Sequence, residues 1–296
     1  DLVRSRGLGD VYKRQILVSD KLGAAALERL KEHADMSVDV KTGLSKEQLL
    51  EVIPEYDGLI VRSGTQVTAD VLAAGKKLRV VGRAGVGVDN IDVKAATMSG
   101  VVVMNTPGAN SMATAELTMA LMLAVSRNIA QAHGSLKAGE WRRSDFVGVQ
   151  LHHKMLGIVG FGRVGKLVAE RAKAFGMDVL VFDPLALEET AREMGVMLVE
   201  MDELLSQSDY ITLHAALNPS TTKLINADTI AQMKDGVILI NAARGKLLDE
   251  AAVAEGLKSG KIKAAAIDVY SSEPPPADHP LLGLPNVVHV PHLGAS

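Results

Sequence analysis

The sequence predicts an α/β protein built from two doubly wound parallel sheets. Its 296 residues suggest two domains of ordinary size. Short apolar runs alternate with helical patterns along the chain, and this order is typical of parallel sheets. Hydrophobic residues make up 47% of the chain but aromatic residues only 3%. The apolar content is therefore mainly aliphatic, which suits buried parallel strands and the helices that cover them.

Composition argues against several classes of partner and site. The net charge of −3 gives no reason to expect a nucleic acid or a membrane as partner. The chain has no cysteine, which excludes disulfides, thiolate zinc sites and a cysteine nucleophile. The most apolar stretch, residues 112–125, contains Glu116 and is too short to cross a membrane. We expect no metal site, a small-molecule substrate and a cytoplasmic location.

The first predicted domain spans residues 16–105. Residues 1–15 have neither a strand nor a helix period and resemble translated adapter sequence, so we interpret them as a non-native leader; a genuine disordered tail is the alternative. Ser45 and Gln48 have the spacing of a capping box at a helix start. The predicted strands are Ile16–Val18, Gly58–Val61, Val80–Gly82 and Val101–Met104.

The second predicted domain spans residues 106–291, with the boundary near Asn105–Pro107. We expect it to open with one long helix from Ser111 to Gln131. A charged, glycine-containing loop follows at Lys137–Gly148 and holds the only tryptophan, Trp141. The predicted strands are Leu156–Val159, Val179–Phe182, Tyr210–Leu213, Val237–Ile240, Ala264–Ile267 and Val287–Val290.

A glycine-rich turn joins the first strand of this second series to a helix. The turn has the pattern Gly-x-Gly-x-x-Gly, with glycines at 160, 162 and 165. Gly160 permits a tight turn, Gly162 lets the backbone approach a pyrophosphate, and Gly165 allows close packing of helix on strand. The N–H groups at the helix start would bind the phosphates. Strand, turn and helix in this order predict a dinucleotide site.

Asp183 indicates which dinucleotide the site binds. It ends the next predicted strand, about 20 residues on, where a carboxylate accepts a hydrogen bond from a ribose hydroxyl. A carboxylate there repels a 2′-phosphate, and no Arg or Lys stands in the next three positions. The sequence therefore favours NAD over NADP. The alternative is an aspartate that only caps a turn or a helix.

Three further blocks lie in the second half: Asn241 to Gly245, Asp268 to Pro274, and Pro291 to Ser296. Together with the glycine turn, they resemble the D-isomer-specific 2-hydroxyacid dehydrogenase family, and the resemblance covers residues 16–296. It implies a flavodoxin-like substrate domain and a Rossmann NAD-binding domain. It also implies that residues 292–296 begin a segment that returns to the substrate domain.

The resemblance implies a catalytic set of Arg244, Glu273 and His292. His292 suits the transfer of a hydroxyl proton near neutral pH, and Glu273 would fix its ring and stabilise the imidazolium. Arg244 offers a fork of donors to a carboxylate or a developing alkoxide. Taken alone, His292 could be a surface or core histidine, Arg244 could cap a neighbouring helix, and Glu273 could be ordinary solvated charge. For Asp268 a strand-end cap is nearly as good an interpretation. The implied cofactor contacts are Gly160, Gly162, Arg163, Val164, Gly165, Asp183, His214, Ala242, Asp268 and Gly294.

Three segments of the first domain, Val61–Asp70, Gly82–Asn90 and Asn105–Ser111, resemble the branch of the family that oxidises D-3-phosphoglycerate to 3-phosphohydroxypyruvate for serine biosynthesis. This substrate carries a carboxylate and a phosphate, which arginines bind with planar forks. The implied substrate contacts are Arg62, Ser63, Gly64, Arg83 and Asn105, with Arg143 supplied by the neighbouring subunit of a homodimer or tetramer. The alternative for the arginines is ordinary surface charge.

Two other functions remain open from the sequence. One is the same chemistry on another acid, such as glyoxylate, hydroxypyruvate or 2-oxoglutarate. The other is a non-catalytic, NAD-sensing scaffold like the corepressor branch of the family, which can keep Arg244, Glu273 and His292. Formate oxidation is disfavoured because it needs no arginines that bind phosphate.

Overall fold

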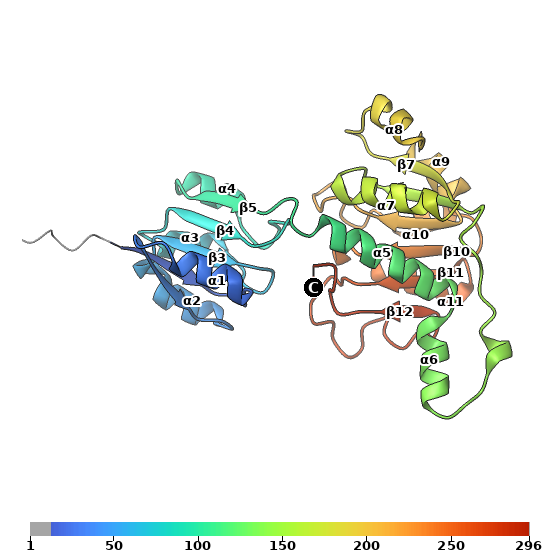
Figure 1. The fold of residues 1–296 in the computed structure, drawn as a ribbon, viewed down its shortest axis with the longest axis horizontal. Helices are drawn as coiled ribbons and strands as arrows, with labels where there is room; N and C mark the ends of the chain where they lie inside the picture. Colours follow the sequence, from blue (N-terminus) through green and yellow to red (C-terminus); the bar gives the residue numbers. More distant parts are fainter. Residues whose placement is uncertain (1–12, 296) are drawn as a thin grey trace, which may run out of the picture. The chain divides into compact units, whose positions relative to one another are not determined.

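The computed structural model describes residues 13–295 and divides into two compact units, unit 1 up to Ala109 and unit 2 from Asn110 (Figure 1). Residues 1–12 of the predicted leader lie outside the described residues. Each unit contains one sheet in which every pair of neighbouring strands is parallel. The predicted α/β class with two doubly wound sheets is therefore confirmed.

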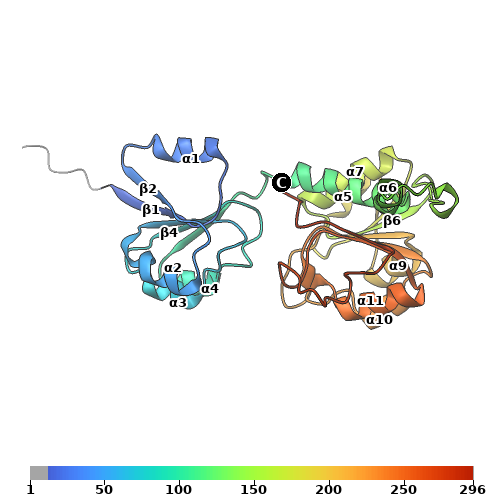
Figure 2. The ribbon, with the colours of Figure 1, turned by 90° about the horizontal axis from the view of Figure 1, so that it is seen from below.

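Unit 1 has the strand order β2-β1-β3-β4-β5, which is the flavodoxin-like order. Figure 2 shows α1 on one face of this sheet and α2, α3 and α4 on the other. The capping box of Ser45 and Gln48 is formed at the start of α2. The elements are β1 (Arg14–Val18), α1 (Ala24–Lys31), β2 (Met36–Val40), α2 (Lys46–Val52), η1 (Ile53–Glu55), β3 (Gly58–Val61), α3 (Ala69–Ala74), β4 (Val80–Arg83), α4 (Val93–Met98) and β5 (Val102–Asn105).

Two features of this sheet differ from the prediction. Strand β1 begins at Arg14, two residues before Ile16, because backbone pairing does not require apolar side chains: Arg14 and Gln15 pair with Met36 and Ser37 of β2. Strand β2 was not predicted. It lies at the edge of the sheet and none of its residues is buried, so its sequence lacks the apolar signal of a core strand.

Unit 2 has the strand order β12-β11-β10-β9-β6-β7-β8. Its first six strands in chain order follow the Rossmann arrangement, and the order reverses between β6 and β9. Figure 2 shows α5 and α7 on one face of the sheet and α9, α10 and α11 on the other. The strands are β6 (Met155–Val159), β7 (Asp178–Phe182), β8 (Met197–Leu198), β9 (Tyr210–Leu213), β10 (Val237–Asn241), β11 (Ile262–Ile267) and β12 (Val287–His289). The helices are α5 (Ser111–Ser126), α6 (Ile129–Lys137), α7 (Arg163–Ala174), α8 (Glu188–Met194), α9 (Met201–Gln207), α10 (Ala227–Gln232) and α11 (Glu250–Ser259), with 3-10 turns η2 (Arg143–Asp145) and η3 (Gly245–Leu247).

The single long helix predicted from Ser111 to Gln131 is wrong. The chain forms α5 and then α6, with a break at Arg127 and Asn128. Asn128 has φ of +53°, a left-handed conformation that asparagine tolerates better than most residues. The apolar pattern of this stretch continues across the break, which is why periodicity alone did not reveal it.

The sheet of unit 2 is buried on both faces. Every residue of β9 and β10 is buried, and separate apolar cores lie on the two sides of the sheet. A strand in such a sheet can offer side chains to a ligand only at its ends. Because the strands are parallel, all their carboxyl ends meet at one edge, which we call the carboxyl edge. No helix within residues 13–295 is long and apolar enough to cross a membrane.

We predict that Gly165→Ala destabilises unit 2. A Cβ at Gly165 would collide with the backbone oxygen of Gly160, a fixed atom that cannot move aside. Alanine favours a helix interior by about 1 kcal/mol over glycine, but overpacking of this kind costs about 1–3 kcal/mol. We therefore expect a net loss in the free energy of unfolding, measured by denaturation in urea without added ligand.

The matched control is Gly162→Ala in the same turn. An ideal Cβ at Gly162 meets nothing within 4 Å, and the backbone φ of −74° suits alanine. We expect it to change the free energy of unfolding by less than about 1 kcal/mol. Equal losses for the two variants would show that close packing at Gly165 does not limit the fold.

Candidate active site

The carboxyl edge of unit 2 collects the residues singled out from the second half of the sequence. They follow six different strands of the sheet, so they are spread along the sequence but lie where these strands end at one edge. They are Gly160 after β6, Asp183 after β7, His214 after β9, Ala242 and Arg244 after β10, Asp268 and Glu273 after β11, and His292 and Gly294 after β12.

The three glycines of the turn have different surroundings. Gly160 has φ of +97°, and a Cβ there would lie 2.6 Å from the backbone carbon of His214. Gly165 packs against the backbone of Gly160, as described above. Only Gly162 faces open space, and as the N-cap of α7 it has no side chain to occupy the first N–H groups of that helix. The turn is therefore packed on the protein side and open where a pyrophosphate would bind.

Asp183 joins the end of β7 to this turn. Its Oδ2 accepts the Phe161 N–H at 2.7 Å, and its Oδ1 accepts the Leu185 N–H at 2.9 Å. The side chain is half-buried, so part of the carboxylate remains accessible. Asp183 thus shapes the backbone of the turn, and its contact with a ribose hydroxyl stays a prediction.

His214 is held against the same turn. Its N–H donates to the Val159 oxygen at 2.7 Å, and its Nε2 lies 3.0 Å from Thr212 Oγ1. Burial lowers the pKa of His214 to about 4, because desolvation disfavours the charged ring. The imidazole is therefore neutral near pH 7 and can form hydrogen bonds without carrying a charge.

A turn built by Asn241 presents Arg244. The buried amide of Asn241 donates to the Arg244 oxygen at 2.9 Å and accepts the Ala243 N–H at 3.1 Å. Arg244 Nη1 donates to the Ala243 oxygen at 2.7 Å. At Gly245 a Cβ would collide with the backbone of Tyr270, so the turn after β10 lies directly against the loop after β11.

Asp268 anchors the loop that follows β12. The carboxylate is fully buried, and its oxygens accept the N–H groups of Leu293 at 2.6 Å and Gly294 at 3.0 Å. Its backbone oxygen accepts the His292 N–H at 2.8 Å. Burial raises the pKa of Asp268 above its ordinary value, although these N–H groups act in the opposite direction. The strand-end role is therefore visible in the geometry, and contact with the cofactor stays a prediction.

Glu273 and His292 share a short hydrogen bond at this edge. His292 Nδ1 lies 2.6 Å from Glu273 Oε2, while Glu273 Oε1 accepts the Tyr270 N–H at 3.1 Å. Burial alone would raise the pKa of Glu273, but the hydrogen bond from His292 and the charge of Arg244 hold it below its ordinary value. Glu273 is therefore a carboxylate at neutral pH. Since Nδ1 is engaged, Nε2 is the ring nitrogen left to exchange a proton with another group.

A pocket of about 440 Å³ adjoins this pair. Apart from Glu273 and His292, its walls are mainly prolines and aliphatic side chains from the loops after β11 and β12. Tyr270 also lines it, and its hydroxyl lies 3.0 Å from His289 Nδ1. Burial, together with the charges of Asp268, Glu250 and Glu273, raises the pKa of Tyr270 to about 12, so the phenol stays protonated. Within residues 13–295 no cluster of three or more His, Asp or Glu side chains suits a metal ion.

Unit 1 has its own carboxyl edge, and five of the six residues predicted to bind substrate lie there. Arg62 follows β3, while Arg83 and Asn105 end β4 and β5. In the sheet register Val61 pairs with Arg83, and Arg83 pairs with Asn105, so the three strand ends are adjacent. Arg83 Nη1 donates to the Ala84 oxygen at 3.2 Å, and the Asn105 amide donates to the Val86 oxygen at 2.6 Å. Ser63 and Gly64 lie next to Arg62 and are exposed.

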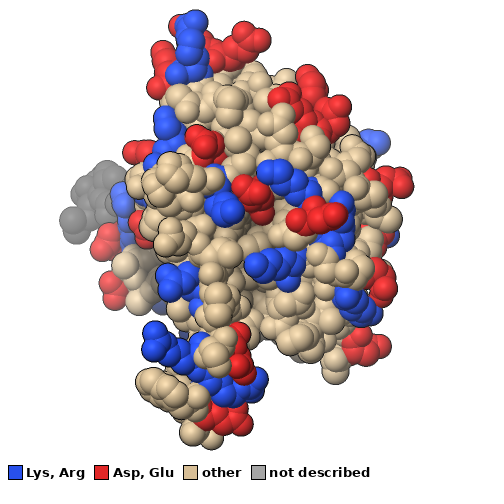
Figure 3. Space-filling model, turned by 90° about the vertical axis from the view of Figure 1, so that its right-hand side faces the viewer, with Lys and Arg blue, Asp and Glu red and all other residues tan. Residues whose placement is uncertain are grey.

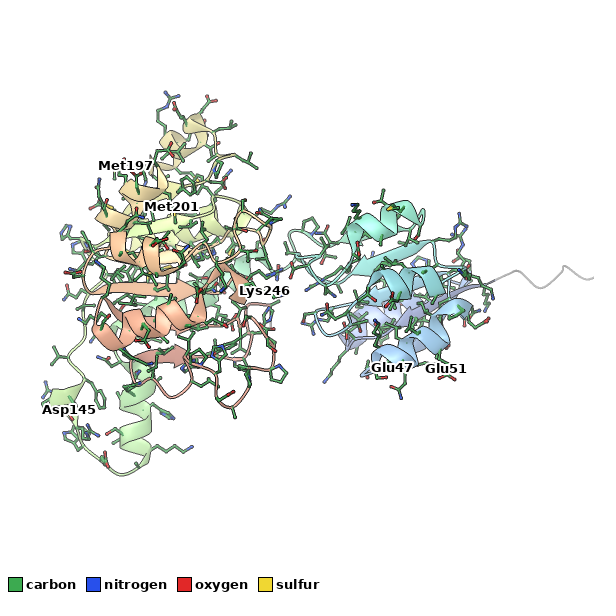
Figure 4. All side chains as sticks on the ribbon, turned by 180° about the vertical axis from the view of Figure 1, so that it is seen from behind. Glu47, Glu51, Asp145, Met197, Met201 and Lys246 are labelled. Atoms are coloured by element: carbon green, nitrogen blue, oxygen red, sulfur yellow. The ribbon has the colours of Figure 1, made fainter. Side chains whose placement is uncertain are left out.

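Arg143, the remaining residue predicted to bind substrate, belongs to unit 2. It begins the 3-10 turn η2, in the loop after α6, and is exposed. Figure 4 labels Asp145 of the same turn at the end of unit 2 opposite Lys246, which lies close to the carboxyl edge in η3. Arg143 therefore lies away from the carboxyl edge of its own unit, and its contact with a substrate in a neighbouring subunit stays a prediction.

Several residues that shape the site were not singled out from the sequence. Asn241 was quoted only as part of a motif, yet it builds the turn that carries Arg244. Tyr270 holds Glu273 through a backbone N–H, which no side-chain pattern reveals. The available signal was positional, because a polar residue directly after a buried parallel strand stands at the carboxyl edge.

The comparisons with known proteins agree with this architecture. Residues 119–294 match the family described as D-isomer specific 2-hydroxyacid dehydrogenase, NAD binding domain. The chain is 54% identical over 283 residues to D-3-phosphoglycerate dehydrogenase of Methanocaldococcus jannaschii and 46% identical over 283 residues to the human enzyme of that name. These alignments cover 95% and 96% of this chain but only 53% of each relative, so the chain spans about half their length.

Solved structures give the same result over nearly the whole chain. The TT0316 protein of Thermus thermophilus has a TM-score of 0.86 and 38% identity, covering 95% of this chain and 90% of that one. A glyoxylate reductase from Paecilomyes thermophila has a TM-score of 0.86 and 33% identity, covering 95% and 89%. The chain therefore belongs to the D-isomer specific 2-hydroxyacid dehydrogenase family, and its second unit contains that family's NAD-binding domain.

Proposed function

We propose that the protein containing this chain oxidises D-3-phosphoglycerate to 3-phosphohydroxypyruvate with NAD. The observation that carries the proposal is the Glu273–His292 pair, with Arg244 close enough for its charge to act on Glu273, at the edge where the nucleotide-binding turn also ends. This arrangement supplies a proton acceptor and a cation beside a dinucleotide site. The 45–54% identity to several proteins named D-3-phosphoglycerate dehydrogenase supports this choice of substrate.

The residues of unit 2 would divide the work of hydroxyl oxidation. When bound, NAD supplies the hydride acceptor. His292 takes the hydroxyl proton at Nε2, while Glu273 holds the ring through Nδ1 and balances the positive charge that forms. In the reverse direction the imidazolium returns the proton to the carbonyl oxygen. Arg244 stabilises negative charge on the substrate carboxylate or on the oxygen that loses the proton.

The residues of unit 1 would supply the binding of the substrate's anionic groups. Arg62 and Arg83 come from adjacent strand ends, and their guanidinium groups can bind a phosphate or a carboxylate through paired hydrogen bonds. Asn105 and the exposed backbone at Ser63 and Gly64 add neutral donors. A substrate with two anionic groups suits such a set better than a small unphosphorylated acid does.

We also propose a cytoplasmic homodimer or tetramer in which Arg143 serves the neighbouring subunit. The loop that carries Arg143 also exposes two large apolar side chains, Trp141 and Val147, each 81% exposed in the single chain. Its Arg142 pairs with Glu140 and Asp145, so this arginine is already neutralised within the loop. On the face of unit 2 shown in Figure 3, positive and negative side chains are interspersed.

Sedimentation velocity tests the proposed assembly. A monomer in that experiment would contradict it.

A pair of substrates that differ by one phosphate tests the proposed reaction. We expect a higher kcat/KM, with NADH as reductant, for 3-phosphohydroxypyruvate than for hydroxypyruvate, glyoxylate or 2-oxoglutarate. Arg62→Ala should raise KM by about tenfold for the phosphorylated acid and by less for hydroxypyruvate, because it removes a charged hydrogen-bond donor. Arg79→Ala, at the opposite end of the same sheet, is the control. A preference for an unphosphorylated acid would reject the proposed substrate, and equal effects of Arg62→Ala would reject its phosphate role.

Asp183 should determine the choice of cofactor. We predict that Asp183→Ala weakens NAD binding by about tenfold and reduces discrimination against NADP, because a hydrogen-bond acceptor and a repulsive charge are both lost. Asp178→Ala, at the amino end of the same strand, should change neither value. Titration with the fluorescent reduced forms, NADH and NADPH, compares the two affinities. An unchanged preference for NAD over NADP would leave Asp183 as a turn residue only.

His292 should act on the chemical step and not on cofactor binding. We expect His292→Ala to lower kcat by about 10²–10⁴-fold while the affinity for NAD stays within about twofold. Glu273→Gln keeps the size of the side chain but removes its charge, and it should lower kcat by a smaller factor. His133→Ala, an exposed histidine of α6, is the control. Turnover near that of the unmodified protein in His292→Ala would remove this residue from the mechanism.

A further inference from the structure

Two side chains of unit 1 hold the segment Arg62–Thr65 by its backbone. Asp20 Oδ2 accepts the N–H of Arg62 at 2.6 Å and the N–H of Thr65 at 3.1 Å. The Asn90 amide donates to the oxygen of Arg62 at 2.8 Å and to that of Thr65 at 2.7 Å. Asp20 therefore accepts the N–H groups of the first and last residues of the segment, and Asn90 donates to the carbonyl groups of the same two residues.

The residues between these two fixed points remain exposed. Ser63 and Gly64 form the tip of the segment, and no hydrogen bond of their N–H groups is found within the described part of the chain. An ideal Cβ at Gly64 would lie only 2.8 Å from Asp20 Oδ1, so a larger residue there would press against the holding carboxylate. Two adjacent exposed N–H groups that no other group of the described chain accepts are suitable donors to an anionic oxygen.

The hydrogen bonds of Asp20 and Asn90 to the Arg62–Thr65 segment form what we call the clamp, and the charge of Asp20 has an unfavourable effect on anion binding. Asp20 places a carboxylate beneath a site meant for an anion, and this charge opposes binding. The benefit is geometric, because the four backbone hydrogen bonds that Asp20 and Asn90 make together fix the segment before a ligand binds. Thr65 Oγ1 adds a further bond to Asp20 Oδ1 at 3.0 Å and lies 2.9 Å from Ser19 Oγ, which ties the segment to the end of β1.

We propose that Asp20 and Asn90 are positioning residues that clamp the Arg62–Thr65 segment, so that the N–H groups of Ser63 and Gly64 bind an anionic group of the substrate. This inference rests on the proposed hydroxy-acid oxidation. Neither residue touches the substrate. Their effect is expressed through KM for the acid, while KM for NAD depends on unit 2.

Two substitutions at Asp20 separate geometry from charge. Asp20→Ala removes every bond of the carboxylate, and we expect KM for 3-phosphoglycerate to rise by about tenfold, with kcat and KM for NAD within about twofold. Asp20→Asn can keep one oxygen on both N–H groups and donate its amide to Thr65 Oγ1. It should therefore restore KM close to that of the unmodified protein. Asn90→Asp replaces the amide that donates to two carbonyl oxygens with a carboxylate that can only accept. It should therefore raise KM for 3-phosphoglycerate as Asp20→Ala does.

Asp57→Ala is the matched structural control. Asp57 is a buried aspartate of unit 1 that also accepts a backbone N–H, but it lies at the amino end of β3. Its loss should lower the melting temperature by about 4 °C or more without moving KM for the acid. The clamp is overturned if Asp20→Ala leaves KM unchanged, or if Asp20→Asn is as damaging as Asp20→Ala.

Hydrogen exchange tests the clamp independently of turnover. Asp20→Ala should speed exchange at the amides of Arg62 and Thr65, whereas Asp57→Ala should not. Unchanged exchange in Asp20→Ala would refute the clamp even in a chain without activity. If the unmodified protein turns over a different hydroxy acid, KM is measured for that acid: the proposed substrate then fails, while the clamp is still decided by the Asp20 variants.

Discussion

A parallel sheet covered by helices on both faces leaves its strand ends as the places where side chains can meet a ligand. In unit 2 this constraint brings together six strand ends from positions 160 to 292 in the sequence. The reversal of strand order between β6 and β9 separates the two following connections and opens the edge where the glycine turn lies. The dinucleotide turn, Arg244 and the Glu273–His292 pair all depend on this arrangement of strands.

Many polar side chains at the strand ends form hydrogen bonds with the backbone of neighbouring loops and so hold these loops in place. Asp183 fixes the glycine turn, Asn241 builds the turn of Arg244, and Asp268 anchors the loop of His292. Asp20 and Asn90 do the same for a segment of unit 1. Loop backbone near a site has N–H and carbonyl groups that must find partners, and short side chains at strand ends are the nearest available ones. Precise placement of a few reactive groups therefore requires a larger set of supporting ones.

Burial divides the titratable groups of unit 2 into neutral and charged sets. Desolvation lowers the pKa of His214 to about 4 and contributes to raising that of Tyr270 to about 12, so both are neutral at pH 7. Glu273 differs because His292, Tyr270 and Arg244 together outweigh its burial and keep its pKa low. A carboxylate and a guanidinium, Glu273 and Arg244, therefore remain charged near His292, where proton transfer is proposed.

The sequence by itself determined the α/β class, most strand positions, the dinucleotide turn and the family, because each is expressed in local patterns of apolar residues, glycines and short motifs. It did not reveal the edge strand β2, which is not buried, or the break at Asn128, across which the apolar pattern continues. Tertiary structure alone decided which groups share a hydrogen bond. Glu273 and His292 are 19 residues apart, and Asp20 and Arg62 are 42 apart. Such pairs form when strands become neighbours in a sheet, and neighbourhood in a sheet is not encoded by spacing along the chain.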